Sequence, residues 1–115
     1  MKKFVAIMCV PVSTMQEWME KTDEAARKEQ MDKMMQDWET WSQKNKDAIL
    51  DQGYPVGKTK RVTADGVSDI RNDLNYIMMV QADSPEAAAE MFKDNPHLAI
   101  PNSYIDISES SHPGM

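Results

Sequence analysis

Cysteine and basic residues are scarce in this chain, and each shortage excludes something. The 115 residues include one cysteine, Cys9, so no disulfide can form within the chain, and a reducing compartment is favoured. The 13 lysines and arginines face 19 acidic residues, which gives a formal net charge of −6. Nucleic-acid binding needs a basic field that displaces phosphate counterions, so no nucleic-acid partner is expected.

Long apolar runs and cofactor motifs are also missing. No stretch is long enough to span a membrane. The apolar run at 4–10 is too short for a secretory signal and lacks a small-residue cleavage site, so we expect a cytoplasmic protein without a membrane partner. Two distant histidines and one cysteine give no metal-ligand spacing, and no glycine-rich phosphate loop or serine nucleophile elbow is present. No metal and no cofactor are therefore predicted.

What remains is an ordinary globular composition, with 41% hydrophobic and 28% charged residues. The length is close to the commonest size of a single domain. We therefore predict one domain at residues 1–109, followed by a flexible C-terminal tail at 110–115.

The hydrophobic pattern predicts elements in the order strand, long helix, strand, strand, helix, strand. Helical spacing of apolar residues continues to about Asp51, and Gly53 is placed to end that helix in a left-handed turn. Ser84 and Pro85 are typical of a helix start. The predicted elements are a strand at 3–10, a short helix capped by Ser13 or Thr14, a helix at 23–51, strands at 58–63 and 76–82, a helix at 84–93 and a strand at 103–108.

The predicted strand at 58–63 carries a basic cluster of Lys58, Lys60 and Arg61. We interpret the cluster as a solvated strand edge, where lysines discourage unwanted pairing, rather than as a phosphate site. Turn-prone pairs within 64–75 predict a long, irregular hairpin loop after it.

This order predicts an α+β fold of ferredoxin-like βαββαβ topology with a four-stranded antiparallel sheet. Two helices cover only one face of such a sheet. The first and third strands nevertheless carry apolar residues at both alternations, for example Ala6 against Ile7 and Met78 against Ile77. We therefore expect a second sheet to pack across the open face and to cover these apolar side chains. A homodimer supplies the second sheet most simply, with the two sheets facing each other.

Several segments resemble YCII-related proteins, which are also grouped with the DGPF-domain proteins. The segments are Trp38-Glu39-Thr40-Trp41 on the long helix, residues 58–60 with 62–69, and residues 95–101 followed by the strand at 104–107. The resemblance covers residues from the first strand to about Glu109. It implies a dimeric α+β barrel. Some members carry a histidine–aspartate pair, with the histidine early in the first long helix, but the histidines of this chain are His97 and His112, so that pair cannot be transferred.

His97 is the strongest candidate for chemistry, because a neutral imidazole serves as acid, base or ligand near pH 7. It follows a predicted helix end and precedes the last strand, so the alternative is a helix cap or a structural hydrogen bond, which we favour. Asp106 is a candidate carboxylate partner, because its alternation in the last strand points it away from the helices. A surface-exposed strand position is the simpler interpretation of Asp106.

Four further residues are candidates for ligand binding. Trp38 and Trp41 share one stripe of the long helix with Asn45, and Tyr104 shares its strand face with Asp106. The tryptophans are more simply explained as core, and a buried Asn45 either orients a ligand or locks the helix. Cys9 in a central strand is expected to be an inert, buried thiol.

Three functions remain open at this point. The first is a small-molecule-binding homodimer without strong catalytic activity. The second is an enzyme acting on a small organic or aromatic compound, with His97 as acid or base. The third is a regulatory or assembly module whose main product is the dimer interface.

Overall fold

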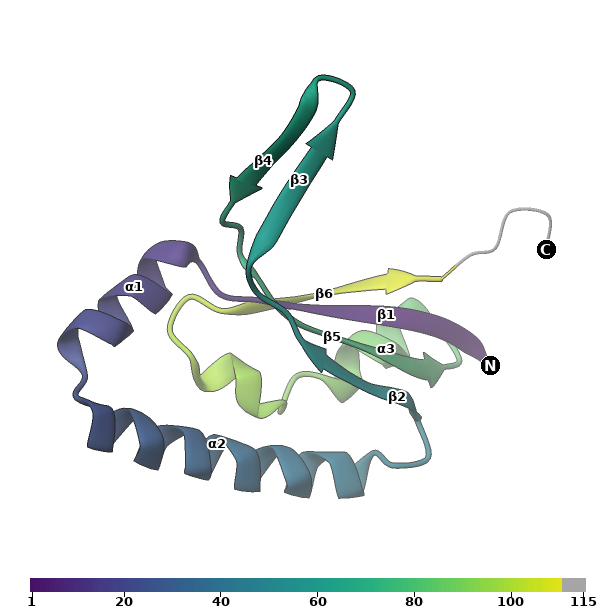
Figure 1. The fold of residues 1–115 in the computed structure, drawn as a ribbon. Helices are drawn as coiled ribbons and strands as arrows, with labels where there is room; N and C mark the ends of the chain where they lie inside the picture. Colours follow the sequence, from purple (N-terminus) through teal and green to yellow (C-terminus); the bar gives the residue numbers. More distant parts are fainter. Residues whose placement is uncertain (111–115) are drawn as a thin grey trace.

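Four strands form an antiparallel sheet of order β2–β5–β1–β6 in the computed structural model, which describes residues 1–110 (Figure 1). Their bounds are β1 (Lys2–Cys9), β2 (Ile49–Pro55), β5 (Leu74–Ala82) and β6 (Tyr104–Glu109). The central pair, β1 and β5, is also the most apolar in sequence. The predicted α+β class and its four-stranded antiparallel sheet are therefore confirmed.

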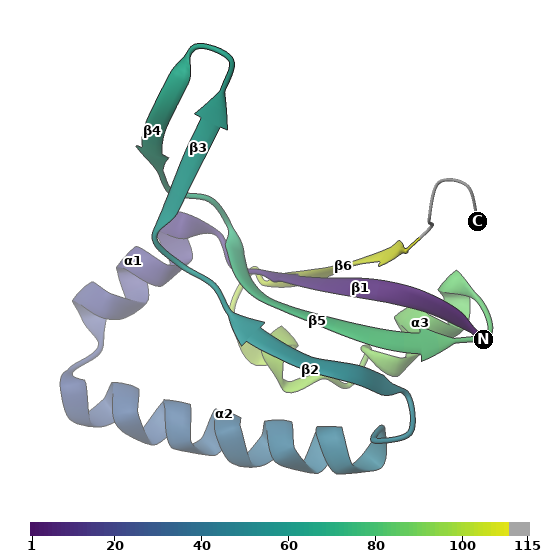
Figure 2. The ribbon, with the colours of Figure 1, turned by 45° about the vertical axis from the view of Figure 1, so that its right-hand side comes forward.

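The helical elements are α1 (Val12–Lys21), α2 (Glu24–Lys44), α3 (Pro85–Met91) and the short 3₁₀ turn η1 (Pro96–Ala99). Figure 2 shows α2 and α3 on one side of the sheet, whereas α1 continues beyond the end of β1. Within residues 1–110, no helix has both the length and the apolar character that a membrane crossing requires.

Helix starts follow local capping chemistry at two of the three α-helices. Asp23 caps α2 by accepting from the Ala26 N–H at 2.8 Å. Ser84 caps α3 by accepting from the Ala87 N–H at 3.1 Å, as its sequence predicts. The predicted Ser13 or Thr14 cap is wrong: α1 begins at Val12, and no side chain caps it.

The core lies between the sheet and the helices, and strand alternation selects its members. Phe4, Ala6 and Met8 of β1 are each 0% exposed, whereas the intervening Val5 and Ile7 are half-buried on the opposite face. Burying one large apolar side chain stabilises the fold by about 1.5–3 kcal/mol. The other buried members of this cluster are Trp41, Met78, Val80, Ala88 and Phe92.

The long helix ends earlier than its spacing predicts. It was expected to reach Asp51, but α2 stops at Lys44 because Asn45 turns back on the helix end. Both the backbone N–H and the side-chain amide of Asn45 donate to the Trp41 carbonyl, at 3.1 and 2.9 Å. Ile49 then enters the sheet opposite Val80, so its apolar side chain reaches the core as part of a strand.

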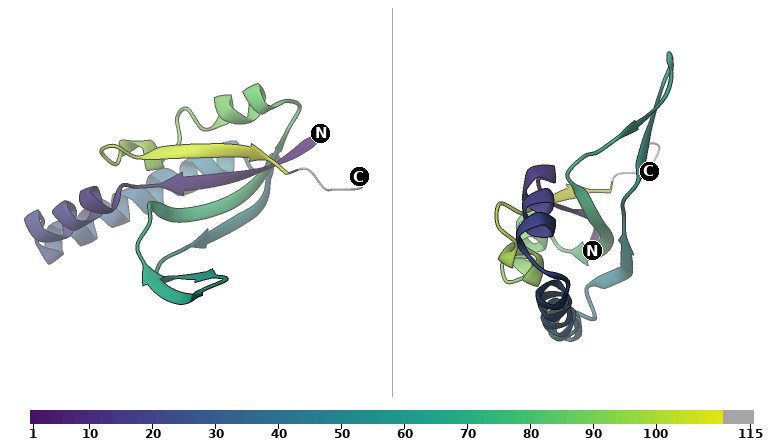
Figure 3. Two further views of the ribbon diagram at one scale, coloured as in Figure 1. Left: turned by 90° about the horizontal axis from the view of Figure 1, so that it is seen from above. Right: turned by 60° about the vertical axis from the view of Figure 1, so that its left-hand side comes forward.

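Because β2 takes the sheet edge, the strand predicted at 58–63 does not belong to the main sheet. Instead, β3 (Thr59–Thr63) pairs with β4 (Gly66–Ile70) in a separate hairpin. The long irregular loop expected at 64–75 is wrong, since most of it forms β4 and the start of β5. Figure 3 shows the hairpin projecting away from the body. In its register Val62 pairs with Val67.

The flexible tail predicted at 110–115 lies outside the described residues, except for Ser110. The Ser110 N–H donates to the Lys3 carbonyl at 2.8 Å, which extends the pairing of β6 with β1.

The sequence predicts that Gly53 ends the long helix, and this prediction is wrong. Gly53 instead forms an irregularity in β2, where β2 pairs with β5. Its φ is +80°, and a Cβ there would lie 1.8 Å from the Ile77 carbonyl oxygen. Only glycine allows this close approach of two backbones without strain. The register of β2 also shifts on either side of Asp51, and Gly53 lies within the second of these irregular intervals.

We predict that Gly53→Ala lowers the free energy of unfolding by roughly 2–4 kcal/mol, because both the left-handed backbone and the Ile77 carbonyl oppose a side chain. Gly57→Ala is the matched control, since a Cβ at Gly57 meets nothing within 4 Å. Its effect should stay within about 1 kcal/mol. Urea unfolding followed by circular dichroism measures both, and equal effects would contradict the assignment.

Candidate functional site

His97 lies in η1 and is buried, with 3% of its surface exposed. The turn is fixed by Asn95, whose side-chain oxygen accepts from the His97 backbone N–H at 2.9 Å. The imidazole Nε2–H donates to the Cys9 carbonyl at 2.9 Å, tying η1 to the end of β1. The imidazole therefore makes the structural hydrogen bond that was the favoured alternative to catalysis.

The surroundings of His97 keep its ring neutral. Burial lowers the pKa of His97 below its ordinary value of 6.5, and hydrogen bonds to the backbone of Cys9 and Tyr104 oppose the shift. Among residues 1–110, no carboxylate is paired with this imidazole, so none orients it as a base.

Asp106 lies on the other side of the sheet from η1. It pairs with Ile7 in the β1–β6 register, so both side chains point away from the helices, as predicted. The carboxylate is exposed in this single chain. The structure therefore places His97 on the helix-covered side and Asp106 on the open side.

Trp38 and Trp41 fill the space between α2 and the sheet. Trp41 is 3% exposed, and its Nε1–H donates to the Met91 carbonyl at 3.2 Å. Its ring centroid lies 5.0 Å from that of Phe92 and 5.9 Å from that of Trp38. Trp38 in turn contacts Tyr76 at 5.3 Å between centroids. The aromatic cluster is a packed part of the core.

Asn45 and Tyr104 are also engaged by neighbours. Asn45 caps α2, as described above. The Tyr104 hydroxyl donates to Asp73 Oδ2 at 2.8 Å, and this hydrogen bond raises the pKa of Tyr104. Cys9 lies opposite Tyr104 in the β1–β6 register and is 6% exposed. Burial raises the pKa of the Cys9 thiol, and a hydrogen bond with Tyr104 partly offsets this.

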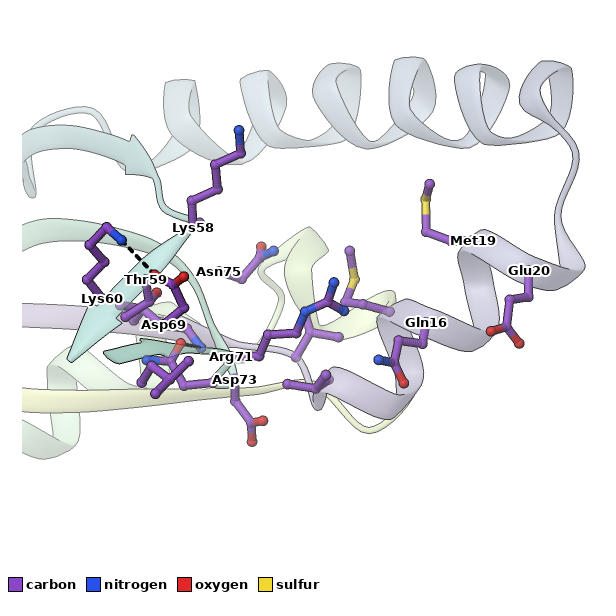
Figure 4. A pocket seen from close by; sticks show the side chains of 17 residues that line it. Gln16, Met19, Glu20, Lys58, Thr59, Lys60, Asp69, Arg71, Asp73 and Asn75 are labelled. Atoms are coloured by element: carbon purple, nitrogen blue, oxygen red, sulfur yellow. Dashed lines mark hydrogen bonds and ion pairs between the residues drawn. The ribbon is translucent and has the colours of Figure 1, made fainter. Parts of the chain in front are cut away.

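A cavity lies between α1 and the base of the hairpin, and we call it the charged cleft. It has a volume of about 940 Å³. Figure 4 shows polar and charged side chains converging on it from β3, from residues 69–75 and from α1. None of the six predicted site residues lines it. Its lining includes Met15, Glu20, Lys58, Lys60, Asp69, Arg71, Asp73 and Asn75.

Most carboxylates of the charged cleft are already occupied. Asp69 pairs with Lys60 at 2.7 Å, and Asp73 accepts from Tyr104. Arg71 and Lys58 have no carboxylate partner within residues 1–110, and both are exposed. Lys58 also holds a φ of +42°, which is uncommon for a residue with a side chain.

A second cavity, which we call the apolar groove, lies between α1, α2 and the link from η1 to β6. It has a volume of about 630 Å³. Its apolar walls include Met15, Trp18, Met31, Met34, Pro96 and Ile100. The Trp18 Nε1–H donates to Gln30 Oε1 at 2.7 Å, so the indole is held across the two helices. None of the predicted site residues lines this groove either.

The sequence contained a partial signal for the charged cleft. Lys58 and Lys60 stood out as a basic cluster but were interpreted as a strand edge, and Arg71 lay in a predicted loop. Only the folded hairpin brings these three cations opposite α1.

Among residues 1–110, no group of three or more histidine, cysteine, aspartate or glutamate side chains is arranged to hold a metal ion. No protein-family model matches the chain, and no curated protein is significantly similar to it.

We predict that stability falls as the pH drops below 6.5, because the lowered pKa of folded His97 lets the unfolded chain bind the proton first. The stabilising contribution of His97 is fully present above pH 6.5. It is lost as the pH falls towards the lowered pKa of His97 in the folded state. His97→Gln, which keeps an amide donor, should remove this part of the pH dependence in urea unfolding between pH 7 and 5. His112→Gln is the control; a dependence that vanishes with it instead would contradict the assignment.

We also predict that native Cys9 reacts with an aromatic disulfide reagent at pH 8 at least about tenfold more slowly than the urea-unfolded chain, since burial and a raised pKa suppress the thiolate. Stopped-flow absorbance measures both rates. Equal rates in the two states would show that the thiol is accessible.

Proposed function

We propose that this protein is a small-molecule-binding homodimer of the dimeric α+β barrel class, with a ferredoxin-like subunit. In sequence order, the four strands of the main sheet pair as second, third, first, fourth, which is the order that a ferredoxin-like subunit requires. Within that class, the YCII-related or DGPF-domain family is the proposed affiliation, on the resemblance of residues 38–41 and 95–107.

The uncovered face of the main sheet supports the dimer. Val5 and Ile7 of β1 pair with Met79 and Ile77 of β5, and all four side chains point away from the helices. Tyr54, opposite Ile77 on the edge strand, is 64% exposed. A contiguous apolar sheet face of this kind is stabilised by burial against another surface. A second copy offers a matching surface through twofold symmetry.

The charged cleft is the observation that carries ligand binding. Its volume of about 940 Å³ lies at the upper end of the range typical of small-molecule sites, roughly 300–1,000 Å³. Apolar side chains from α1 face polar and charged groups from the hairpin across it. By contrast, the space between α2 and the sheet, one of the places expected to hold a ligand, is filled by aromatic rings.

Binding is favoured over catalysis because His97, the proposed acid or base, is buried against backbone groups and lines neither cavity. The proposal includes a cytoplasmic location, which the single unpaired Cys9 supports.

We predict that Met79→Glu converts the protein from dimer to monomer, because it places a charge in the centre of the proposed interface. Met35→Glu is the matched control, since Met35 is 68% exposed on α2. Native mass spectrometry of freshly purified protein gives subunit number and any retained ligand together. A wild-type monomer at micromolar concentration, or a dimer unaffected by Met79→Glu, would overturn the sheet-to-sheet dimer.

A further inference from the structure

The charged cleft and the apolar groove are neighbours with a shared wall. Met15 and Asn75 line both of them. Met15 belongs to α1 and Asn75 to the start of β5, so the two cavities meet where α1 passes the end of the sheet. The two cavities are therefore adjacent, with Met15 and Asn75 between them.

The charged cleft carries equal numbers of cationic and acidic side chains, but two of its cations are not paired with a carboxylate among residues 1–110. Its cations are Lys58, Lys60 and Arg71, and its carboxylates are Asp69, Asp73 and Glu20. Lys60 and Asp69 pair with each other, and Asp73 accepts the Tyr104 hydroxyl. Asp73 keeps its negative charge while it accepts this hydroxyl, and Lys58 and Arg71 form no ion pair among residues 1–110. In Figure 4 the Arg71 side chain extends from the hairpin side towards α1, across the cleft.

A guanidinium in this position is suited to a carboxylate. Arginine presents a planar fork of N–H donors that matches the two oxygens of a carboxylate, and such charge-assisted pairs are the stronger hydrogen bonds in proteins. Lys58, whose φ is +42°, also lines the cleft and supplies a second cation.

The apolar groove has the opposite character. Met31 and Met34 of α2 face Trp18 of α1, and Pro96 and Ile100 close the far side. Methionine side chains adapt to irregular apolar ligands because they are unbranched and polarizable. Met31 is 55% exposed in this structure, so a ligand in the groove would remove apolar surface from water.

We propose that the two cavities form one site for an amphipathic carboxylate, whose anionic head pairs with Arg71 and Lys58 and whose apolar tail lies over Met15 in the groove. This inference rests on the proposed function, because it names the ligand class of the same site. A neutral apolar ligand would leave the two cations unpaired, and a small hydrophilic anion would leave the groove unfilled.

The test uses octanoate as the probe, with 1-octanol lacking the charge and acetate lacking the tail. Trp18 lies in the groove wall, so its fluorescence reports filling, and calorimetry gives the affinity. Wild-type protein should bind octanoate at least about tenfold more tightly than either control compound.

Arg71→Gln should weaken octanoate binding about tenfold or more and leave 1-octanol binding unchanged. Arg61→Gln is the matched control: Arg61 is an exposed arginine of β3 that does not line the cleft, and its loss should change neither affinity. Since Arg71 is exposed, its variant should unfold at the wild-type temperature, which circular dichroism verifies.

The outcomes separate the two proposals. If 1-octanol binds as tightly as octanoate and Arg71→Gln changes neither, the carboxylate inference is overturned while small-molecule binding stands. If neither compound binds to the wild-type dimer, ligand binding at this site fails as well. If Arg61→Gln weakens octanoate as much as Arg71→Gln does, the effect is a general loss of charge and the assignment of Arg71 is wrong.

Discussion

The helices of this protein cover one face of its main sheet and leave the other without a cover from its own chain. Phe4, Ala6 and Met8 are completely buried on the helix side, whereas Val5 and Ile7 on the same strand stay half-buried on the other. A strand that is apolar on both faces is stable in water only when both faces are covered. The imbalance is the physical reason to expect that a second copy covers the open face.

Much of the fold could be predicted, because it follows from local rules. Short apolar runs located β1 and β5, apolar alternation located β6, and Ser84 with Pro85 located the start of α3. The segment after the long helix could not be predicted in the same way. Ile49 fits a helical stripe as well as a strand, and only its pairing with Val80 decides between them. Gly53 likewise suits a helix end or a bulge, and the choice depends on Ile77, which is remote in sequence.

Much less of the candidate site could be predicted. The residues selected for their chemistry, such as His97 and Trp41, are in the structure hydrogen-bonding and packing groups of the interior. Aromatic rings and imidazoles suit cores and sites equally, so residue type alone does not distinguish the two. The cavities depend on contacts between α1 and the hairpin, which are set by the three-dimensional path of the chain. No pattern within either segment encodes that encounter.

The anchoring of α1 has a mechanical consequence. Among the helical elements of residues 1–110, α1 is the one that contributes no buried side chain, although it forms a wall of both cavities. A helix held mainly by its two connections, with little packing beneath it, opens at low free-energy cost. A ligand seated under α1 would then act as a substitute core, supplying the apolar contacts that the polypeptide omits and rigidifying the helix as it binds.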